Sequence, residues 1–196
     1  MRVLVGCESS GVVREAFRAM GHDAWSCDLL HQDDDCLFHL KMDVREAIKL
    51  GWDLAILHPT CTFLTVSANR WLKDGVKASP GILTGEARRE ARREAIQFVK
   101  DLAASPIERI AIENPIGALS SEWRKPDQII QPWQFGHGET KATCLWLKNL
   151  PKLNPTDIVE GREQRIHKMP PGPNRWKERS RTFTGVAKAM ASQWNF

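Results

Sequence analysis

The chain has 196 residues, 42% hydrophobic and 27% charged, which is the balance of a globular domain with a real core. No apolar run approaches the roughly 20 residues of a membrane span, and the short apolar N-terminus predicts a first strand rather than a signal peptide. The five cysteines form no C-x-x-C pair, which favours a reducing, cytoplasmic compartment. A net charge of +4 permits an anionic partner without requiring one.

Short apolar runs and amphipathic segments alternate along the chain. Strands are predicted at residues 2–6, 24–27, 38–42 and 53–57, with helices at 11–20 and 44–50 between them. A long helix at 86–104 with Thr84 as its cap precedes strands at 109–112 and 143–147 and a final helix at 186–194. This alternation predicts a single α/β domain over residues 1–196, with a mostly parallel sheet and helices on both faces.

Polar side chains stand at the predicted carboxyl ends of the strands, where open α/β sheets bind their ligands. They are Glu8, Asp28, Asp43, Cys61 and Glu113. Four carboxylates and a thiol at one edge predict a binding or catalytic site, because a purely structural edge would need turn residues alone.

The first strand ends in the turn CESSGVV, which holds Glu8, Ser9, Ser10 and Gly11. Backbone amides at a helix N-terminus bind oxygen or negative charge, so these residues are candidates for a cofactor turn. Asp28 can accept hydrogen bonds from ribose hydroxyls or cap a turn. Asp43 can belong to the same site or can be the N-cap of the next helix.

The stretch DLAILHPTC, residues 53–61, carries a buried strand into Cys61, and Pro59 stiffens the turn before the thiol. A cysteine nucleophile needs thiolate character and partial exposure, whereas most lone cysteines are buried and inert. Cys61 is therefore a candidate nucleophile, with a structural thiol as the alternative.

The stretch IAIENPIG ends another apolar strand in Glu113 and Asn114. A carboxylate at a strand end of low dielectric can have a raised pKa and then act as an acid near neutral pH. The alternative for Glu113 is a hydrogen-bonded structural acid.

Basic residues concentrate in a loop segment at about 160–182, in which an aromatic residue, Trp176, lies among them. The candidates for phosphate contact are Arg175, Arg179 and Arg181. Such a mixture can follow a phosphate backbone and stack a base, and the alternative is a solvated surface loop. Cys27, His31, Cys36 and His39 also lie close together, but their spacing matches no common zinc finger, so no metal site is predicted.

In their order along the chain, these motifs resemble those of the cytosine-5 DNA methyltransferases. DLAILHPTC is similar to the family's strand and Pro-Pro-Cys loop, with Pro59 kept, Thr60 in place of the second proline and Cys61 on the nucleophile. IENPIG resembles the Glu-Asn-Val motif, with Glu113 and Asn114 kept.

Weaker motifs extend the resemblance over nearly the whole chain. CESSGV falls on the glycine-rich cofactor turn with only Gly11 kept, and His58 stands where the family has glycine. FGHGETKATCLW resembles a Gln-x-Arg-x-Arg strand in which Lys141 and Thr143 replace the arginines. FTGVAKAMASQW, which contains Thr184, is similar to the C-terminal helix that returns to the cofactor pocket.

The resemblance implies a Rossmann-like, class I S-adenosylmethionine-dependent methyltransferase fold and DNA cytosine-5 methylation. Cys61 would add to carbon 6 of cytosine, Glu113 would supply a proton to ring nitrogen 3, and Lys141 would hold the base or a phosphate. Asn114 and the three arginines of the basic segment would contact the substrate. S-adenosylmethionine would be bound by Glu8, Ser9, Ser10, Gly11, Asp28, Asp43, His58, Pro59 and Thr184.

Only residues 148–182 separate the Gln-x-Arg-x-Arg-like strand from the last helix, which is too little for a recognition domain. The chain thus resembles a short, phage-type member, expected in the cytoplasm of a bacterium or phage-infected cell. Its DNA substrate is expected to be single-stranded or loosely specified, with no membrane partner. A transferase acting on RNA or a free nucleotide, and a silent protein that only binds cofactor or nucleic acid, stay open as alternatives.

Overall fold

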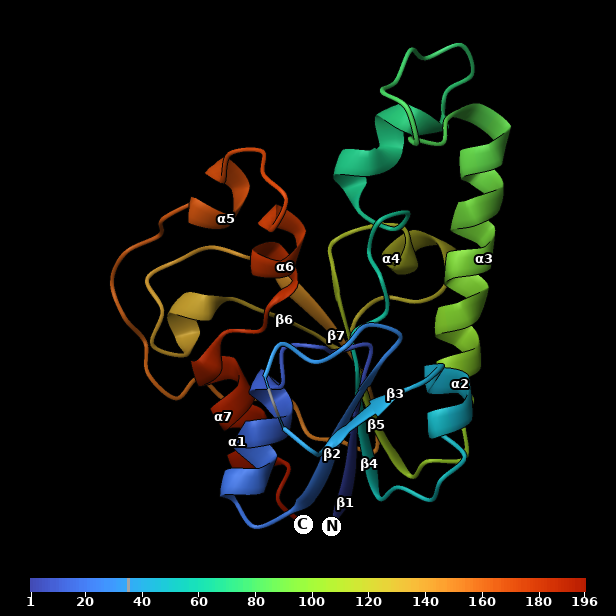
Figure 1. Ribbon diagram of the computed structural model, residues 1–196. Helices are drawn as coiled ribbons and strands as arrows, with labels where there is room; N and C mark the ends of the chain where they lie inside the picture. Colours follow the sequence, from blue (N-terminus) through green and yellow to red (C-terminus); the bar gives the residue numbers. More distant parts are fainter. Residues whose placement is uncertain (35) are drawn as a thin grey trace.

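The structure, a computed structural model, describes residues 1–34 and 36–196 and has a seven-stranded sheet at its centre (Figure 1). The strands run in the order β3-β2-β1-β4-β5-β7-β6. They are β1 (Arg2–Gly6), β2 (Asp23–Asp28), β3 (His39–Lys41), β4 (Leu54–Leu57), β5 (Arg109–Pro115), β6 (Gln128–Ile130) and β7 (Thr143–Lys148). All pairs from β3 to β5 are parallel, whereas β7 is antiparallel to both β5 and β6. The predicted mostly parallel sheet is confirmed.

Helices cover both faces of the sheet (Figure 1). On one face α1 (Val12–Ala19) and α7 (Thr184–Gln193) share a buried core with residues such as Phe17, Met190 and Trp194. The other core includes residues of α2 (Val44–Ala47), α3 (Gly85–Ala103) and α4 (Leu119–Glu122). The four residues of β4 are all buried, because a central parallel strand has a helical layer on each side. That explains why its sequence, LAIL, is continuously apolar.

Several elements differ from their predicted bounds. The helix predicted at 44–50 ends at Ala47, and the chain continues as turns before Gly51, whose φ is 78°. Strand β5 extends to Pro115, so Glu113 and Asn114 lie inside the strand and pair with β7 instead of following the strand. Strand β6 has no predicted counterpart, because three residues are too few to show a period.

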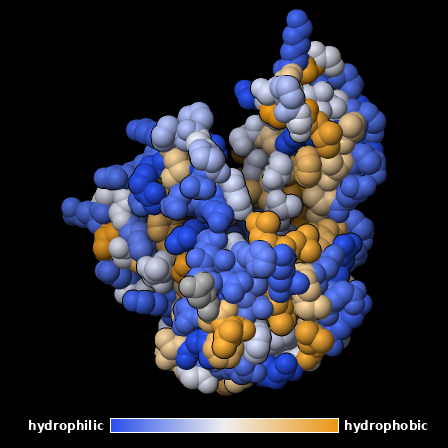
Figure 2. Space-filling view, in the orientation of Figure 1, coloured by the Kyte–Doolittle hydropathy of each residue, from blue (hydrophilic) through white to orange (hydrophobic). Residues whose placement is uncertain are grey.

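The segment at about 160–182 is not a loop throughout, since it contains the short helices α5 (Arg165–Lys168) and α6 (Arg175–Ser180). Two 3-10 helices, η1 (Val66–Leu72) and η2 (Pro132–Gln134), complete the described elements. In Figure 1, α5 and α6 form one lobe, while η1 and the N-terminal part of α3 form another. Figure 2 shows a groove between these lobes, and the carboxyl ends of the parallel strands face it. Among the described helices, none has the length and apolarity that crossing a membrane requires.

Candidate active site

Cys61 and Glu113 are brought together by the pairing of two neighbouring strands. The register of β4 and β5 sets Leu57 opposite Ile112, so the loop after β4 lies beside the end of β5. Buried Asn114 then donates a hydrogen bond of 2.7 Å from Nδ2 to the carbonyl oxygen of Pro59. This bond ties the loop that carries the thiol to the strand that carries the acid.

Cys61 is an exposed residue whose thiol is nevertheless partly shielded from water by its surroundings. This burial raises the pKa of the Cys61 thiol, the negative charge of Glu113 acts in the same direction, and Lys141 and Arg179 partly oppose them. The resting thiol is therefore protonated at neutral pH, and its ionisation depends on additional positive charge.

Glu113 is paired with a residue that the sequence assigned to the cofactor. Nδ1 of His58 lies 3.1 Å from Oε2 of Glu113, and the two side chains are only 10% and 16% exposed. Burial raises the pKa of Glu113, but the hydrogen bond and charge of His58, with the charge of Lys141, outweigh it and leave that pKa below its ordinary value. The prediction of a raised pKa for Glu113 is wrong, because it considered burial without His58.

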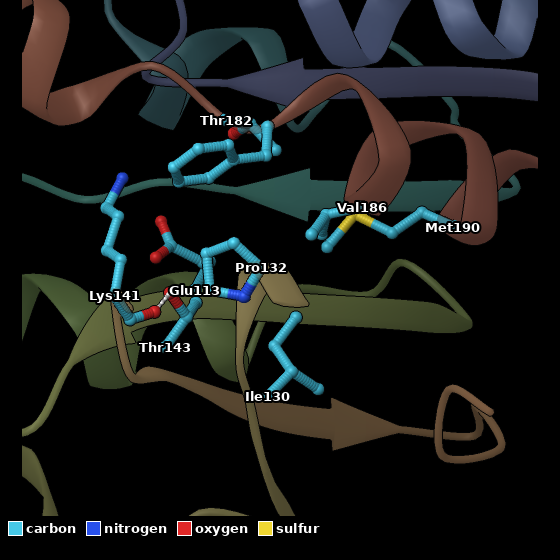
Figure 3. A pocket seen from close by; sticks show the side chains of 9 residues that line it. Glu113, Ile130, Pro132, Lys141, Thr143, Thr182, Val186 and Met190 are labelled. Carbon is cyan, nitrogen blue, oxygen red and sulfur yellow. Dashed lines mark hydrogen bonds between the residues drawn. The ribbon is translucent and has the colours of Figure 1, made fainter. Parts of the chain in front are cut away.

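Glu113 and Lys141 also line a small pocket (Figure 3). Its remaining lining is largely apolar and consists of Ile130, Pro132, Thr143, Thr182, Phe183, Val186 and Met190. The Lys141 ammonium donates a hydrogen bond of 3.2 Å to the carbonyl of Arg181 and lies 5.9 Å from the centre of the Phe183 ring. Most of these lining residues escaped the sequence analysis, since apolar positions in β6 and α7 look like ordinary core.

The turn after β1 holds an unsatisfied acid. Oε1 of Glu8 accepts hydrogen bonds from Ser10 Oγ at 2.8 Å and from the Val13 amide at 3.1 Å. Oε2 of Glu8 is buried and has no partner among the described residues. Gly11 has a φ of 69°, and a Cβ there would collide with the side chain of Arg14, so the turn requires glycine. The turn therefore offers an acceptor and a close backbone approach to a ligand.

The remaining predicted cofactor residues are only partly engaged. Asp28 ends β2, and its Oδ1 accepts a bond of 2.9 Å from the Leu30 amide. Asp43 is the N-cap of α2 and accepts from the Arg45 amide at 2.8 Å, as its capping alternative predicted. Thr184 lies 3.3 Å from His137 through its hydroxyl. Cofactor contact stays a prediction for all three, as it does for Ser9, whose carbonyl accepts from the Asp33 amide at 2.8 Å.

The basic segment reaches the site through α6. The side chain of Arg179 makes no hydrogen bond to the described residues, and its charge lowers the pKa of Cys61. Lys177 and Arg181 form ion pairs with Asp33 at 2.9 and 3.2 Å, which tie α6 to the loop after β2. Arg175 donates to the Met169 carbonyl at 2.9 Å. Of the three predicted phosphate contacts, Arg179 is the one whose charge acts on Cys61.

The cysteines and histidines weighed as a zinc site have separate partners. The thiol of Cys27 donates to the Met42 carbonyl at 3.3 Å, while the ring of His39 bonds to Ser26 and to the Leu30 carbonyl. Across residues 1–34 and 36–196, no three His, Cys, Asp or Glu side chains are arranged to hold a metal.

No protein-family model and no curated protein sequence matches the chain. Among solved structures, the chain is similar to the crystal structure of the Dnmt2 methyltransferase of S. pombe, with 16% identity, a TM-score of 0.46 and coverage of 86% of this chain and 55% of that chain. It is also similar to a DNMT2 mutant of Spodoptera frugiperda, with 12% identity, a TM-score of 0.43 and coverage of 82% and 57%. The chain thus spans little more than half the length of either neighbour.

The fold class follows from the sheet itself. The order β3-β2-β1-β4-β5-β7-β6, with β7 antiparallel and helices on both faces, is that of a Rossmann-like, class I methyltransferase fold. In such open sheets, ligands bind beyond the carboxyl ends of the strands; Glu8 and Cys61 follow β1 and β4, Asp28 is the last residue of β2, and Glu113 lies near the end of β5. The predicted fold class is confirmed.

Proposed function

We propose that this chain is an S-adenosylmethionine-dependent methyltransferase that methylates carbon 5 of cytosine in DNA. The observation that carries the proposal is the meeting of Cys61 and Glu113 at the ends of paired strands, with the Asn114–Pro59 bond holding the two segments together. An exposed thiol beside a buried carboxylate supplies the nucleophile and the proton-transfer group that this chemistry needs.

Carbon 5 of cytosine becomes nucleophilic only after carbon 6 has been attacked. The Cys61 thiolate adds to carbon 6, and Glu113 handles the proton that ring nitrogen 3 takes up, which gives an enamine. When bound, S-adenosylmethionine supplies the methyl group that carbon 5 then accepts. Loss of the carbon 5 proton to water expels Cys61, and return of the nitrogen 3 proton to Glu113 restores the neutral aromatic ring. Lys141 and Arg179 favour the thiolate, because both already act to lower the pKa of Cys61.

The turn after β1 fits the cofactor. Buried Oε2 of Glu8 has no partner among the described residues, and it is an acceptor suited to the ammonium group of the cofactor's amino-acid part. The left-handed Gly11 lets the backbone approach closely, and partly exposed Asp28 keeps Oδ2 available for the ribose hydroxyls.

DNA is the proposed partner because α6 carries basic side chains and the charge of one of them, Arg179, acts on Cys61. This short helix belongs to a lobe that borders the groove, where phosphates can be neutralised (Figures 1 and 2). In a duplex, the target cytosine must be flipped out of the stack to reach the thiol. A segment of this size contacts few base edges, so we propose a substrate that is single-stranded or loosely specified in sequence. We also propose that the protein acts in the cytoplasm.

A trapping assay tests the proposal. The protein is incubated with S-adenosylmethionine and DNA that contains 5-fluorocytosine. In this base fluorine replaces the hydrogen on carbon 5, so the step that releases Cys61 cannot occur. We expect a covalent adduct that maps to Cys61 by mass spectrometry. It should be absent in Cys61→Ser and kept in Cys144→Ala, since Cys144 is fully buried in β7.

The same assay with 5-fluorocytosine in RNA separates the two polynucleotide substrates. An adduct on RNA alone would replace DNA by RNA in the proposal. The absence of any adduct on either polymer, in protein that binds S-adenosylmethionine, would overturn cytosine-5 transfer to a polynucleotide.

A further inference from the structure

His58 occupies a position that the resemblance gives to glycine, and its surroundings suggest a task. It follows β4 directly, and its amide donates to the Gly6 carbonyl at 2.9 Å. Its ring is 10% exposed and meets Glu113 through Nδ1 at 3.1 Å. Nε2 is buried without a partner among the described residues. Burying a histidine ring at this position costs solvation free energy, and a glycine would fill a purely structural role there without that cost.

The reaction proposed above needs a proton for ring nitrogen 3 at neutral pH. Glu113 alone does not hold that proton, since His58 and Lys141 keep its pKa below the ordinary value in spite of burial. Burial lowers the pKa of His58, but the hydrogen bond and charge of Glu113 outweigh this and raise it. Both shifts favour His58 over Glu113 as the residue of the pair that holds the proton.

Other charged groups face the pair from three neighbouring segments. Glu8, in the turn after β1, favours protonated His58, while Lys141, before β7, opposes it. Lys141 also favours the ionised form of Glu113. Cys61, in the loop after β4, experiences the charge of Glu113. The charge of Glu8 thus acts on His58, and the charge of Glu113 acts on the thiol of Cys61.

On the basis of the proposed function, we propose that His58 is a positioning residue. It stores the proton that Glu113 delivers to ring nitrogen 3 of cytosine. As the sulfur of Cys61 bonds to carbon 6, the electrons of the carbon 5–carbon 6 double bond move toward carbon 4, and those of the carbon 4–nitrogen 3 double bond move onto nitrogen 3.

Nitrogen 3 takes its proton from Glu113, which takes one in turn from Nδ1 of His58, and His58 becomes neutral. After methyl transfer, water removes the carbon 5 proton and the thiolate leaves. Nitrogen 3 then returns its proton through Glu113 to His58, so the pair ends as it began.

The first test follows His58 itself and needs no turnover. The imidazole of His58 is titrated by NMR in the full chain and in Glu113→Gln. We expect its pKa to lie above the ordinary value of 6.5 in the wild type and to fall in Glu113→Gln. An unchanged titration would overturn the shared proton, whatever the protein methylates.

The second test uses the pH profile of kcat with saturating DNA and S-adenosylmethionine. His58→Asn keeps an N–H close to the position of Nδ1 but holds no proton, and His58→Gly restores the residue of the resembled family. The wild-type profile should be bell-shaped, with a fall at high pH as the pair loses its proton. His58→Asn should lower kcat by about 100-fold and lose this alkaline fall, with KM and cofactor affinity within about twofold. The matched control, His31→Asn in an exposed loop, should behave as wild type.

The outcomes separate this inference from the proposed function. A wild type that is trapped on 5-fluorocytosine, together with a His58→Asn variant of wild-type kcat and pH profile, would overturn the proton store and leave methyl transfer standing. A wild type that forms no adduct would overturn both, even if His58 and Glu113 titrate together.

Discussion

The edge proposed to bind the cofactor, at the ends of β1 to β3, and the edge proposed to be catalytic, at the ends of β4 and β5, hold their paired carboxylates in different surroundings. Asp43 is 33% exposed, caps a helix and is paired with Arg45, which is 62% exposed. Glu113 is 16% exposed and is paired with His58, which is 10% exposed. Each pair lowers the pKa of its acid. Water weakens the Asp43–Arg45 pair, whereas the His58–Glu113 pair is largely shielded from water and its charges interact more strongly.

The largest expected effect is a loss of turnover that leaves cofactor affinity nearly unchanged. Cys61→Ser should reduce turnover by at least about 1000-fold, because a hydroxyl at this position is far less nucleophilic than a thiolate. Affinity for S-adenosylmethionine should stay within about twofold, since the cofactor turn lies on β1 and not on β4. Methyl-transfer kinetics and calorimetry measure the two quantities. Unchanged activity would remove the covalent mechanism.

The next effect concerns stability and its dependence on pH. The raised pKa of His58 stabilises the fold fully below about pH 6.5, which is the ordinary pKa of histidine. This contribution is lost as the pH rises through the pKa that His58 has in the folded protein. The lowered pKa of Glu113 stabilises it above about 4.5, and this contribution is lost as pH falls through the folded pKa. Both contributions are therefore present together between these two values.

Glu113→Gln should thus cost about 1–3 kcal/mol of unfolding free energy near pH 6 and less near pH 8.5, as measured by urea denaturation. Glu139→Gln is the matched control, an acid-to-amide change at a side chain that is 17% exposed and is paired with Arg165 instead of a histidine. A cost of equal size at both pH values would show that the pair carries no charge in the folded protein.

The contrast between the edges also shows what a sequence can reveal. Cys61 and Glu113 are predictable because each follows an apolar run and because parallel strands share one carboxyl edge. The contact between His58 and Glu113 depends on the register of β4 against β5, which no local pattern contains. The resemblance places the segment that holds Val186 and Met190 at the cofactor pocket, but no local pattern singles out these two residues, since apolar residues on α7 look like core whether they face a helix or a ligand.

A smaller effect is expected at the cofactor edge. Asp28→Ala should weaken binding of S-adenosylmethionine by about tenfold, because a carboxylate that accepts ribose hydroxyls is worth between 1 and 2 kcal/mol. Asp28→Asn keeps the acceptor for the Leu30 amide and tests whether the turn alone matters. Turnover at saturating cofactor should be nearly unchanged in both. If calorimetry finds wild-type affinity in Asp28→Ala, the ribose assignment is wrong.

The smallest effect tests the claim that water makes the Asp43–Arg45 pair weak. Asp43→Ala removes the N-cap of α2 and should cost about 1 kcal/mol of unfolding free energy. Asp43→Asn keeps an acceptor for the Arg45 amide while removing the charge, so it should cost only a few tenths of that amount. If the two variants lose equal stability in urea denaturation, the ion pair holds the helix and exposure does not separate the two edges.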